Sequence, residues 1–333
     1  AAPAPAANDY SISWYGFVRT DYMWDTRKSA QVREDHLNLY PLDKSINAGD
    51  GKDANAVGQS NFLSVVSRLG VKVKGPDVWG AKVSGTLEGD FFGNFEGSSI
   101  GMLRLRHAYA QLDWKKTSLT MGQTWYPTFI PEVFPGVANF STGIMFNPFG
   151  WASQVKLKQN FTKEFSGALT AYKEREFTTA AVTGGTPLVS TTTDLSQNSA
   201  SINSAIPTLH GQLQFKNKNW IAGLGAEYKS LQPLTKFNGS VTTETVNSTS
   251  VVGYFKYSND KFSTFFQGAV SNQSHQRFDY YDYQDQYQDS KKVNNVGYNV
   301  KAGSSYKFAE NHSLYVNAGY YNRQPYHDNV YLN

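Results

Sequence analysis

Hydrophobic and polar residues alternate along the segment 78–92, VWGAKVSGTLEGDFF. One set of alternate positions is apolar or small and includes Val83 and Leu87, whereas the other is mostly polar and includes Lys82 and Glu88. A period of two indicates a β-strand with one apolar and one solvated face. Fifteen residues at about 3.3 Å each, tilted by about 40°, rise roughly 38 Å, which exceeds the hydrocarbon core of a bilayer. The segment predicts a membrane-spanning strand, although a soluble edge hairpin could carry one such strand by chance.

The same alternation recurs along the chain, and this recurrence favours a barrel. The expected strands are 10–25, 32–42, 61–74, 78–92, 101–115, 118–126, 151–161, 164–177, 206–215, 220–229, 246–257, 262–274, 293–308 and 312–323. Short turns such as Gly75-Pro76-Asp77 alternate with long polar loops, as they do in outer-membrane barrels. A single-chain barrel has an even number of strands. We therefore expect an all-β fold, an antiparallel transmembrane β-barrel of about 14–16 strands.

Two stretches depart from the alternation. Residues 127–150 contain four prolines and five phenylalanines, and the prolines exclude a regular strand. A loop this apolar is expected to fold into the barrel or to pack at a subunit contact, and loops of this length are often functional. Within 101–115 the apolar parity changes near His107, as a bulge or a contact with a neighbouring subunit would cause. The candidate residues of a constriction loop are Phe129, Glu132, Phe134 and Phe140.

Composition narrows the class of protein. The 333 residues include no cysteine, which excludes disulfides, thiolate catalysis and cysteine-ligated metals. Aromatic residues make up 15% of the chain, and no apolar run approaches the length of a membrane helix. A net charge of +4 is too small to imply nucleic acid as a partner. These values fit a transmembrane β-barrel, and they also fit a secreted all-β binding protein.

The start of the chain, AAPAPAANDY, is rich in alanine and proline. It predicts a mature end left by signal-peptide cleavage, although a chain cut there for expression would look the same. We expect residues 1–8 to form a flexible tail. Residues 9–333 are expected to form a single β-barrel domain, with the loop at 127–150 inserted in it.

If the apolar faces meet lipid, the polar faces line a water-filled lumen. Cations along a narrow bore lower the entry barrier for anions, and opposed acidic groups set up a transverse field. The same charges on a soluble sheet would serve solubility instead. The candidate pore-lining residues are Arg68, Lys72, Lys74, Lys82, Glu88, Asp90, Arg104 and Arg106.

Evidence for an enzyme or a metal site is weak. The six histidines are scattered without metal-ligand spacing, and no G-x-S-x-G motif is present. An acidic, tyrosine-rich segment could bind Ca²⁺ through oxygen ligands or form an ordinary acidic surface loop. Its carboxylates are Asp279, Asp282, Asp285 and Asp289. We expect no enzymatic activity, no cofactor and no bound metal.

Particular segments resemble known families. The runs SRLGVKVKGPDVWGAKVSGTLEGDFFG (67–93), LRLRHAYAQLDW (103–114) and MGQTWYPTF (121–129) are similar to DcaP-like outer-membrane porins of the Bacteroidetes type, a likeness that covers about residues 9–265. This resemblance implies a trimeric porin barrel that passes small hydrophilic and often anionic solutes. Residues 266–333 resemble barrel strands of TonB-dependent receptors.

These observations predict a porin in the outer membrane of a Gram-negative bacterium, a passive diffusion channel for small hydrophilic and anionic solutes. Its partners would be outer-membrane lipid, lipopolysaccharide and the copies of a homotrimer. The barrel part of a TonB-dependent nutrient receptor is an alternative. A β-rich surface binding protein and an outer-membrane hydrolase are more remote ones.

Overall fold

The computed structural model describes residues 10–32, 37–93, 101–134, 149–174, 182–183, 186–187, 199–232, 235–237, 240–241, 243, 245–272, 296–310 and 312–323. The chain divides into two compact units. The first contains residues 1–112 and 137–145, and the second contains residues 113–136 and 146–333. Antiparallel strands dominate both units, as the alternation predicts.

The first unit begins with eight strands, of which the last ends at the unit boundary. They are β1 (Ser11–Phe17), β2 (Asp21–Asp25), β3 (Ser29–Val32), β4 (Leu37–Pro41), β5 (Gln59–Leu63), β6 (Arg68–Val78), β7 (Ala81–Asp90) and β8 (Arg104–Asp113). The sheet order is β1-β6-β7-β8, and β2-β5 and β3-β4 form separate two-stranded sheets. The expected strand 10–25 is therefore two strands, because β1 pairs with β6 whereas β2 pairs with β5.

The turn of the β6–β7 hairpin lies later in the chain than the sequence suggests. Gly75-Pro76-Asp77 does not form the turn; it belongs to β6, where the register shifts between Gly75 and Val78. Trp79 and Gly80 make the turn instead, with φ values of 51° and 73°. A two-residue hairpin loop with positive φ at both positions has the twist that its flanking strands require. The predicted turn at 75–77 was therefore wrong, and the strand predicted from residue 78 begins at Ala81.

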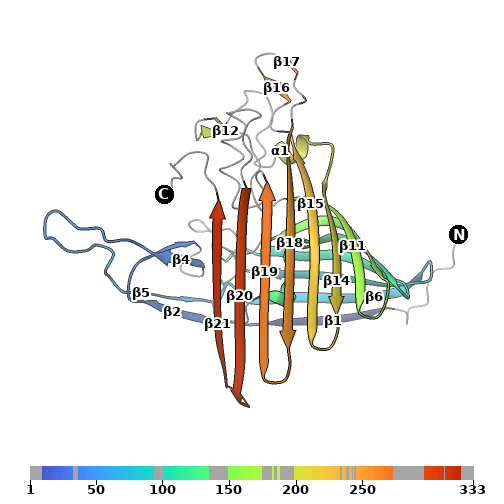
Figure 1. Cartoon of the computed structure of the whole chain (residues 1–333), viewed down its shortest axis with the longest axis horizontal. Coiled ribbons are helices and arrows are strands. Elements are labelled where there is room, and N and C mark those ends of the chain that lie inside the picture. Colours follow the sequence, from blue (N-terminus) through green and yellow to red (C-terminus); the bar gives the residue numbers. More distant parts are fainter. Residues whose placement is uncertain are drawn as a thin grey trace. The chain divides into compact units, whose positions relative to one another are not determined.

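The second unit continues the up-and-down pattern. Its main strands are β9 (Thr117–Trp125), β10 (Trp151–Asn160), β11 (Phe165–Glu174), β14 (Thr208–Lys216), β15 (Trp220–Leu231), β18 (Val246–Ser258), β19 (Phe262–Asn272), β20 (Val296–Ala309) and β21 (His312–Arg323). They follow one another in this order in the sheet, and β18 to β21 lie side by side in Figure 1. Each strand thus pairs with its neighbours in sequence, as hairpin connections dictate.

Short elements lie between these strands. They are the 3₁₀-helix η3 (Pro131–Val133), β12 (Val182–Thr183), β13 (Thr186–Pro187), the helix α1 (Ser199–Asn203), β16 (Lys236–Phe237) and β17 (Ser240–Val241). Within the described residues, no helix is both long and apolar enough to cross a bilayer.

The strands expose their apolar face and bury polar side chains on the other face, which is the reverse of a soluble protein. Large apolar side chains such as Trp14, Leu87 and Leu169 are 71%, 53% and 68% exposed. Polar side chains of the opposite parity are buried, among them Glu88, Asp90, Arg106, Gln154, His210, Glu227 and Lys301. A soluble sheet would bury its apolar face, so an exposed one is suited to acyl chains. The architecture is that of the antiparallel transmembrane β-barrel class.

Candidate functional site

Charged side chains of the first unit form an ion-pair network on the polar face of β7 and β8. Arg104 makes a bidentate contact with Asp90, with Nε–Oδ1 and Nη2–Oδ2 distances of 3.0 and 2.8 Å. Arg106 donates to Glu88 Oε1 at 2.8 Å and to Asp90 Oδ2 at 3.0 Å. Arg68 Nε lies 3.5 Å from Glu88 Oε1. Three guanidinium groups therefore share two carboxylates, so most of their charge is compensated within the protein.

Two further side chains complete this network around Glu88. The Tyr15 hydroxyl donates to Glu88 Oε2 at 2.9 Å, and His107 Nε2 lies 4.0 Å from Glu88 Oε1. Both Arg106 and His107 thus approach Glu88 although they are adjacent in β8. The two residues lie where the apolar parity changes in the sequence.

The remaining candidate cations of this unit are more exposed. Lys72 Nζ lies 5.2 Å from the centre of the Tyr15 ring. Lys82 Nζ lies 3.2 Å from Asp77 Oδ2, and both side chains are mostly exposed near the hairpin turn. Lys74 is exposed on β6. The structure brings Arg68, Glu88, Asp90, Arg104 and Arg106 together and leaves the three lysines outside this network.

The segment that follows β9 packs against strands of the second unit. Phe129 belongs to an apolar cluster with Tyr126 and Tyr172, against which Phe134 packs. Ile130 and Val133 belong to a second cluster, together with Tyr254 and Phe265. Of the four expected constriction residues, Phe129, Glu132 and Phe134 lie in this segment, and Phe140 falls outside the described residues. The apolar residues of the segment thus fold onto the sheet, which agrees with the expectation that this loop does not remain in water.

Glu132 is attached to the sheet at two points. Its Oε1 lies 3.4 Å from Lys216 Nζ on β14, and its main-chain carbonyl accepts a hydrogen bond from Lys256 Nζ on β18 at 3.0 Å. Side chain and main chain of one residue are therefore both fixed, which orients the 3₁₀ turn on the polar face.

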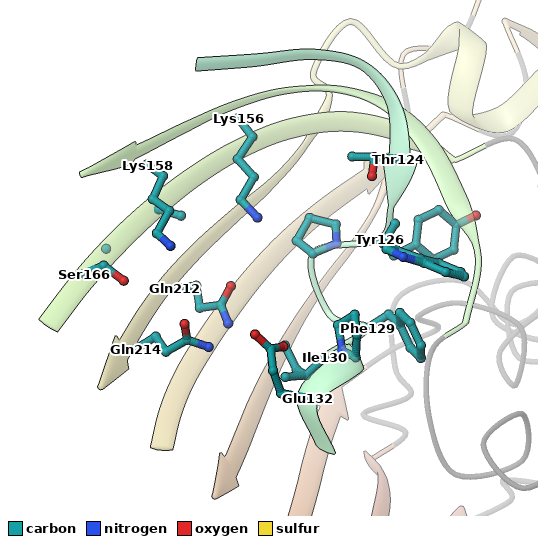
Figure 2. Close-up of a pocket in the computed structure, with 15 residues that line it drawn as sticks. Thr124, Tyr126, Phe129, Ile130, Glu132, Lys156, Lys158, Ser166, Gln212 and Gln214 are labelled. Atoms are coloured by element: carbon teal, nitrogen blue, oxygen red, sulfur yellow. The ribbon is translucent and has the colours of Figure 1, made fainter. Parts of the chain in front are cut away.

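A cavity of about 270 Å³ lies between this segment and strands β10, β11 and β14. Figure 2 shows Lys156 and Lys158 on β10 at one wall of the cavity, and Glu132 at another. Neither lysine forms an ion pair with any residue that the structure describes. The cavity therefore presents two cations on a polar face, together with the carboxylate of Glu132.

Two amide side chains of β14 line the same cavity. Gln212 Nε2 and Gln214 Nε2 both donate to the Tyr254 hydroxyl oxygen, at 2.5 and 2.9 Å. Each amide keeps its Oε1 acceptor and a second N–H donor beside the bond to Tyr254. Sequence reasoning did not select these residues or the two lysines, although the alternation in VKLKQ and LHGQLQ could have placed all of them on the polar face.

A buried polar contact joins three neighbouring strands of this unit. The Tyr172 hydroxyl donates to Glu227 Oε2 at 2.7 Å, and His210 Nδ1 lies 3.4 Å from the same oxygen. The contact links β11, β14 and β15, which fits a structural histidine. Among the described residues no group of His, Cys, Asp or Glu is arranged to hold a metal ion, and the acidic cluster 279–289 lies outside them.

Comparisons with known proteins place the chain in context. A model of the family described as DcaP outer membrane protein matches residues 2–313. The crystal structure of the outer membrane channel DcaP of Acinetobacter baumannii superimposes with a TM-score of 0.67 at 18% identity, covering 97% of this chain and 82% of that one. A loop-deletion mutant of OmpT of Vibrio cholerae gives a TM-score of 0.45 at 13% identity, covering 95% of each chain. No curated protein matches the sequence.

Proposed function

Since the chain belongs to the DcaP outer membrane protein family, we propose that it is a porin, a passive diffusion channel in the outer membrane. The observation that carries the proposal is the pair Lys156 and Lys158, which face a cavity on the polar side of β10 without an ion-pair partner among the described residues. Diffusion past fixed side chains needs no cofactor and no reaction, and the family and fold are those of a channel and not of an enzyme.

We propose that the solutes are small, hydrophilic and mainly anionic. Among the described residues, Lys156 and Lys158 line the cavity with one carboxylate, that of Glu132, which Lys216 and Lys256 also contact. Fixed cations beside a water-filled path attract anions and repel cations by the field they sum to. The arginines of the first unit contribute less to this field, because Glu88 and Asp90 compensate most of their charge.

Recordings in a planar bilayer test both the channel activity and the preference for anions. Purified protein should give a steady, ohmic conductance, and its reversal potential in a salt gradient should show a preference for chloride. Changing Lys156→Glu together with Lys158→Glu should shift the reversal potential toward cations. The matched control is Lys163→Glu with Lys218→Glu, which alters two exposed turn lysines and should leave the selectivity unchanged. An electrically silent protein would refute the channel, and an unchanged reversal potential would refute the role of the two lysines.

The family match continues to residue 313, whereas the sequence resemblance was expected to end at about residue 265. The comparisons give no support to a Bacteroidetes type or to receptor-like strands at 266–333.

The alternative of a TonB-dependent receptor predicts that uptake stops when the proton gradient is collapsed, whereas a porin keeps its flux. A surface binding protein would be extracted without detergent. We propose outer-membrane lipid and lipopolysaccharide as surroundings of the apolar face and a homotrimer as the assembly.

A further inference from the structure

An open apolar groove of about 560 Å³ lies on the outward face of the second unit, across strands β10, β11, β14, β15 and β18. Its floor is formed by small residues of three neighbouring strands, Ala171, Gly211 and Ala226. Larger apolar side chains form its walls, namely Leu157, Leu169, Leu209, Tyr228 and Val251. Since these residues alternate with buried polar ones, the groove opens on the face that meets acyl chains and not on the polar face.

The groove lies at one edge of the apolar band that the bilayer covers. The outward face of β15 runs from Trp220, which packs on Tyr257 with ring centres 4.6 Å apart, to Tyr228. Eight residue steps of about 3.3 Å each, tilted by about 40°, separate these aromatic ends by roughly 20 Å, close to the apolar height of about 25 Å in barrels of this class. Tyr228 and its strand neighbour Thr249 therefore mark the membrane interface at this end of the groove.

The connections at this end of the strands are the longer ones. Residues 175–207 join β11 to β14, and residues 232–245 join β15 to β18. The turns at the opposite end, 161–164 and 217–219, have only four and three residues. Because the outer loops of such barrels are long and the periplasmic turns are short, the groove opens into the outer leaflet.

A cation lies beyond the groove on the same face. Lys173 follows Ala171 by two positions on β11, and the alternation places both residues outward. Its Nζ donates to the main-chain oxygens of Ser201 and Ser204, the latter at 2.7 Å. Both acceptors are neutral, and no carboxylate among the described residues forms an ion pair with Lys173, so its charge is not compensated there. An ammonium group has three N–H donors, which leaves one for an anion.

We propose that the groove binds one lipid with an anionic phosphate headgroup, with an acyl chain over Gly211 and Ala226 and the phosphate beside Lys173. A volume of about 560 Å³ corresponds to about 19 water-sized groups at about 30 Å³ each, enough for an acyl chain of about 14 carbons. The phosphate of a lipid lies at the interface, the level of Lys173, and its chains extend into the hydrocarbon, the level of the floor. The inference rests on the outer-membrane location of this face and does not depend on conduction.

The test measures lipid binding to the detergent-solubilised full chain by native mass spectrometry. The probes are dimyristoylphosphatidylglycerol, which carries the phosphate, and dimyristoylglycerol, which has the same two chains without it. The phosphatidylglycerol is expected to saturate one site per copy and to bind about tenfold more tightly than dimyristoylglycerol, because the latter lacks one charge-assisted hydrogen bond. Equal retention of the two lipids, or uptake without saturation, would overturn the inference.

Variants of the cation test the phosphate contact. Lys173→Gln should weaken binding of the phosphatidylglycerol about tenfold and leave that of dimyristoylglycerol unchanged. Lys173→Arg keeps the charge and should keep the binding of both lipids. The control is Lys163→Gln, at an exposed turn of the opposite end. Binding of the phosphatidylglycerol to Lys173→Gln at wild-type strength contradicts the contact.

Variants of the floor test the groove. Gly211→Leu should weaken binding of both lipids at least tenfold, because its side chain fills the floor. An added Cβ at Gly211 would meet Leu169 Cδ2 at 3.5 Å, an ordinary contact. The matched control is Gly253→Leu, on the same face of β18 but outside the groove, where the Cβ would meet Leu224 Cδ1 at 3.9 Å. Undiminished binding in Gly211→Leu, or an equal loss in Gly253→Leu, excludes the groove as the site.

Spectra of the assembled oligomer distinguish the lipid from a second copy of the chain. The phosphatidylglycerol should remain bound to the oligomer, one molecule for each copy. Loss of the site on assembly would show that a second copy covers the groove, which overturns the inference and leaves the porin function intact. A protein that binds the lipid but does not conduct would refute the porin function and leave the site in place.

Discussion

At the scale of single residues, charged side chains of this protein lie in two different environments, one buried and one exposed to solvent. Arg106 is 3% exposed and contacts two carboxylates, whereas Lys82 pairs with Asp77 in the open. Removing one member of a buried pair leaves uncompensated charge, whereas an exposed pair contributes little because water screens it. The value of a charge therefore depends on its surroundings and cannot be judged from residue type.

Replacing Arg106 tests this difference. Arg106→Gln should lower the free energy of unfolding by about 3 kcal/mol, because Glu88 and Asp90 lose a shared cation in a buried position. Lys82→Gln should change it by less than about 0.5 kcal/mol. Urea titration of the protein in detergent micelles, followed by tryptophan fluorescence, measures both. Equal effects of the two substitutions would contradict the assignment.

A second residue-scale prediction concerns Asp53, in the loop between β4 and β5. Its carboxylate accepts main-chain hydrogen bonds from Ser45 and Asn55 and an ion pair from Arg27 at 2.7 Å. The Ser45 main-chain hydrogen bond first, then the Arg27 side chain, lower the pKa of Asp53 from 3.8 to about 2. Because the folded value lies below the unfolded one, the stabilisation is complete above about pH 4 and is lost as the pH falls toward 2.

Hydrogen exchange of the loop amides measures this pH-dependent stabilisation. Protection factors at Ser45 and Asn55 should be constant at neutral pH and fall between pH 4 and pH 2. Asp53→Ala should remove the protection at every pH. The control is Asp50→Ala, which removes one local hydrogen bond to the Lys52 amide at 3.1 Å. Protection that persists at pH 2 in the wild type would show that Asp53 does not hold the loop.

At the scale of elements, each strand carries two faces with different solvents. On β11, Leu169 is 68% exposed on the apolar face, whereas Ser166 lies on the opposite face and lines the cavity. The alternation was sufficient to assign these faces, because the side-chain period of a strand is fixed at two. It failed at the Trp79-Gly80 turn, where two residues with positive φ separate β6 from β7.

Arginine at each face tests the assignment. Leu169→Arg should destabilise the protein folded in lipid vesicles by about 2–4 kcal/mol, because the guanidinium group would lie in hydrocarbon. Ser166→Arg should have a small effect on stability, since its side chain reaches a water-filled space. Urea unfolding in vesicles compares the two, and the reverse ranking would mean that the faces are exchanged.

At the scale of the whole molecule, both units share antiparallel strands connected in sequence order. Such a chain in the outer membrane has to satisfy its main-chain groups within the sheet, because the bilayer interior offers no water.

Assembly gives the corresponding prediction. The protein should extract only with detergent, migrate faster in an unheated gel than after boiling, and show the mass of three copies by light scattering corrected for detergent. The last result follows from the proposed homotrimer. A mass of one copy would contradict the trimer without affecting the channel, and extraction by salt alone would contradict the membrane-spanning fold.

By itself, the sequence determined most of the strands, their two faces and the membrane as the solvent of one face, although the expected strands 10–25 and 61–74 each proved to be two. Local periodicity suffices for this, because a strand places alternate side chains on opposite sides whatever its neighbours are. It also singled out 127–150 as a segment that leaves the sheet.

Only the tertiary structure decided which charges meet. Arg104 and Arg106 were expected as pore-lining residues, a role that remains a prediction. The fold pairs them with Asp90 and Glu88, which lie on a different strand. Glu132 faces Lys156 and Lys158 across a cavity although about 25 residues separate them in the chain. Such contacts depend on strand register and on the path of a loop, and a pattern along one segment contains neither.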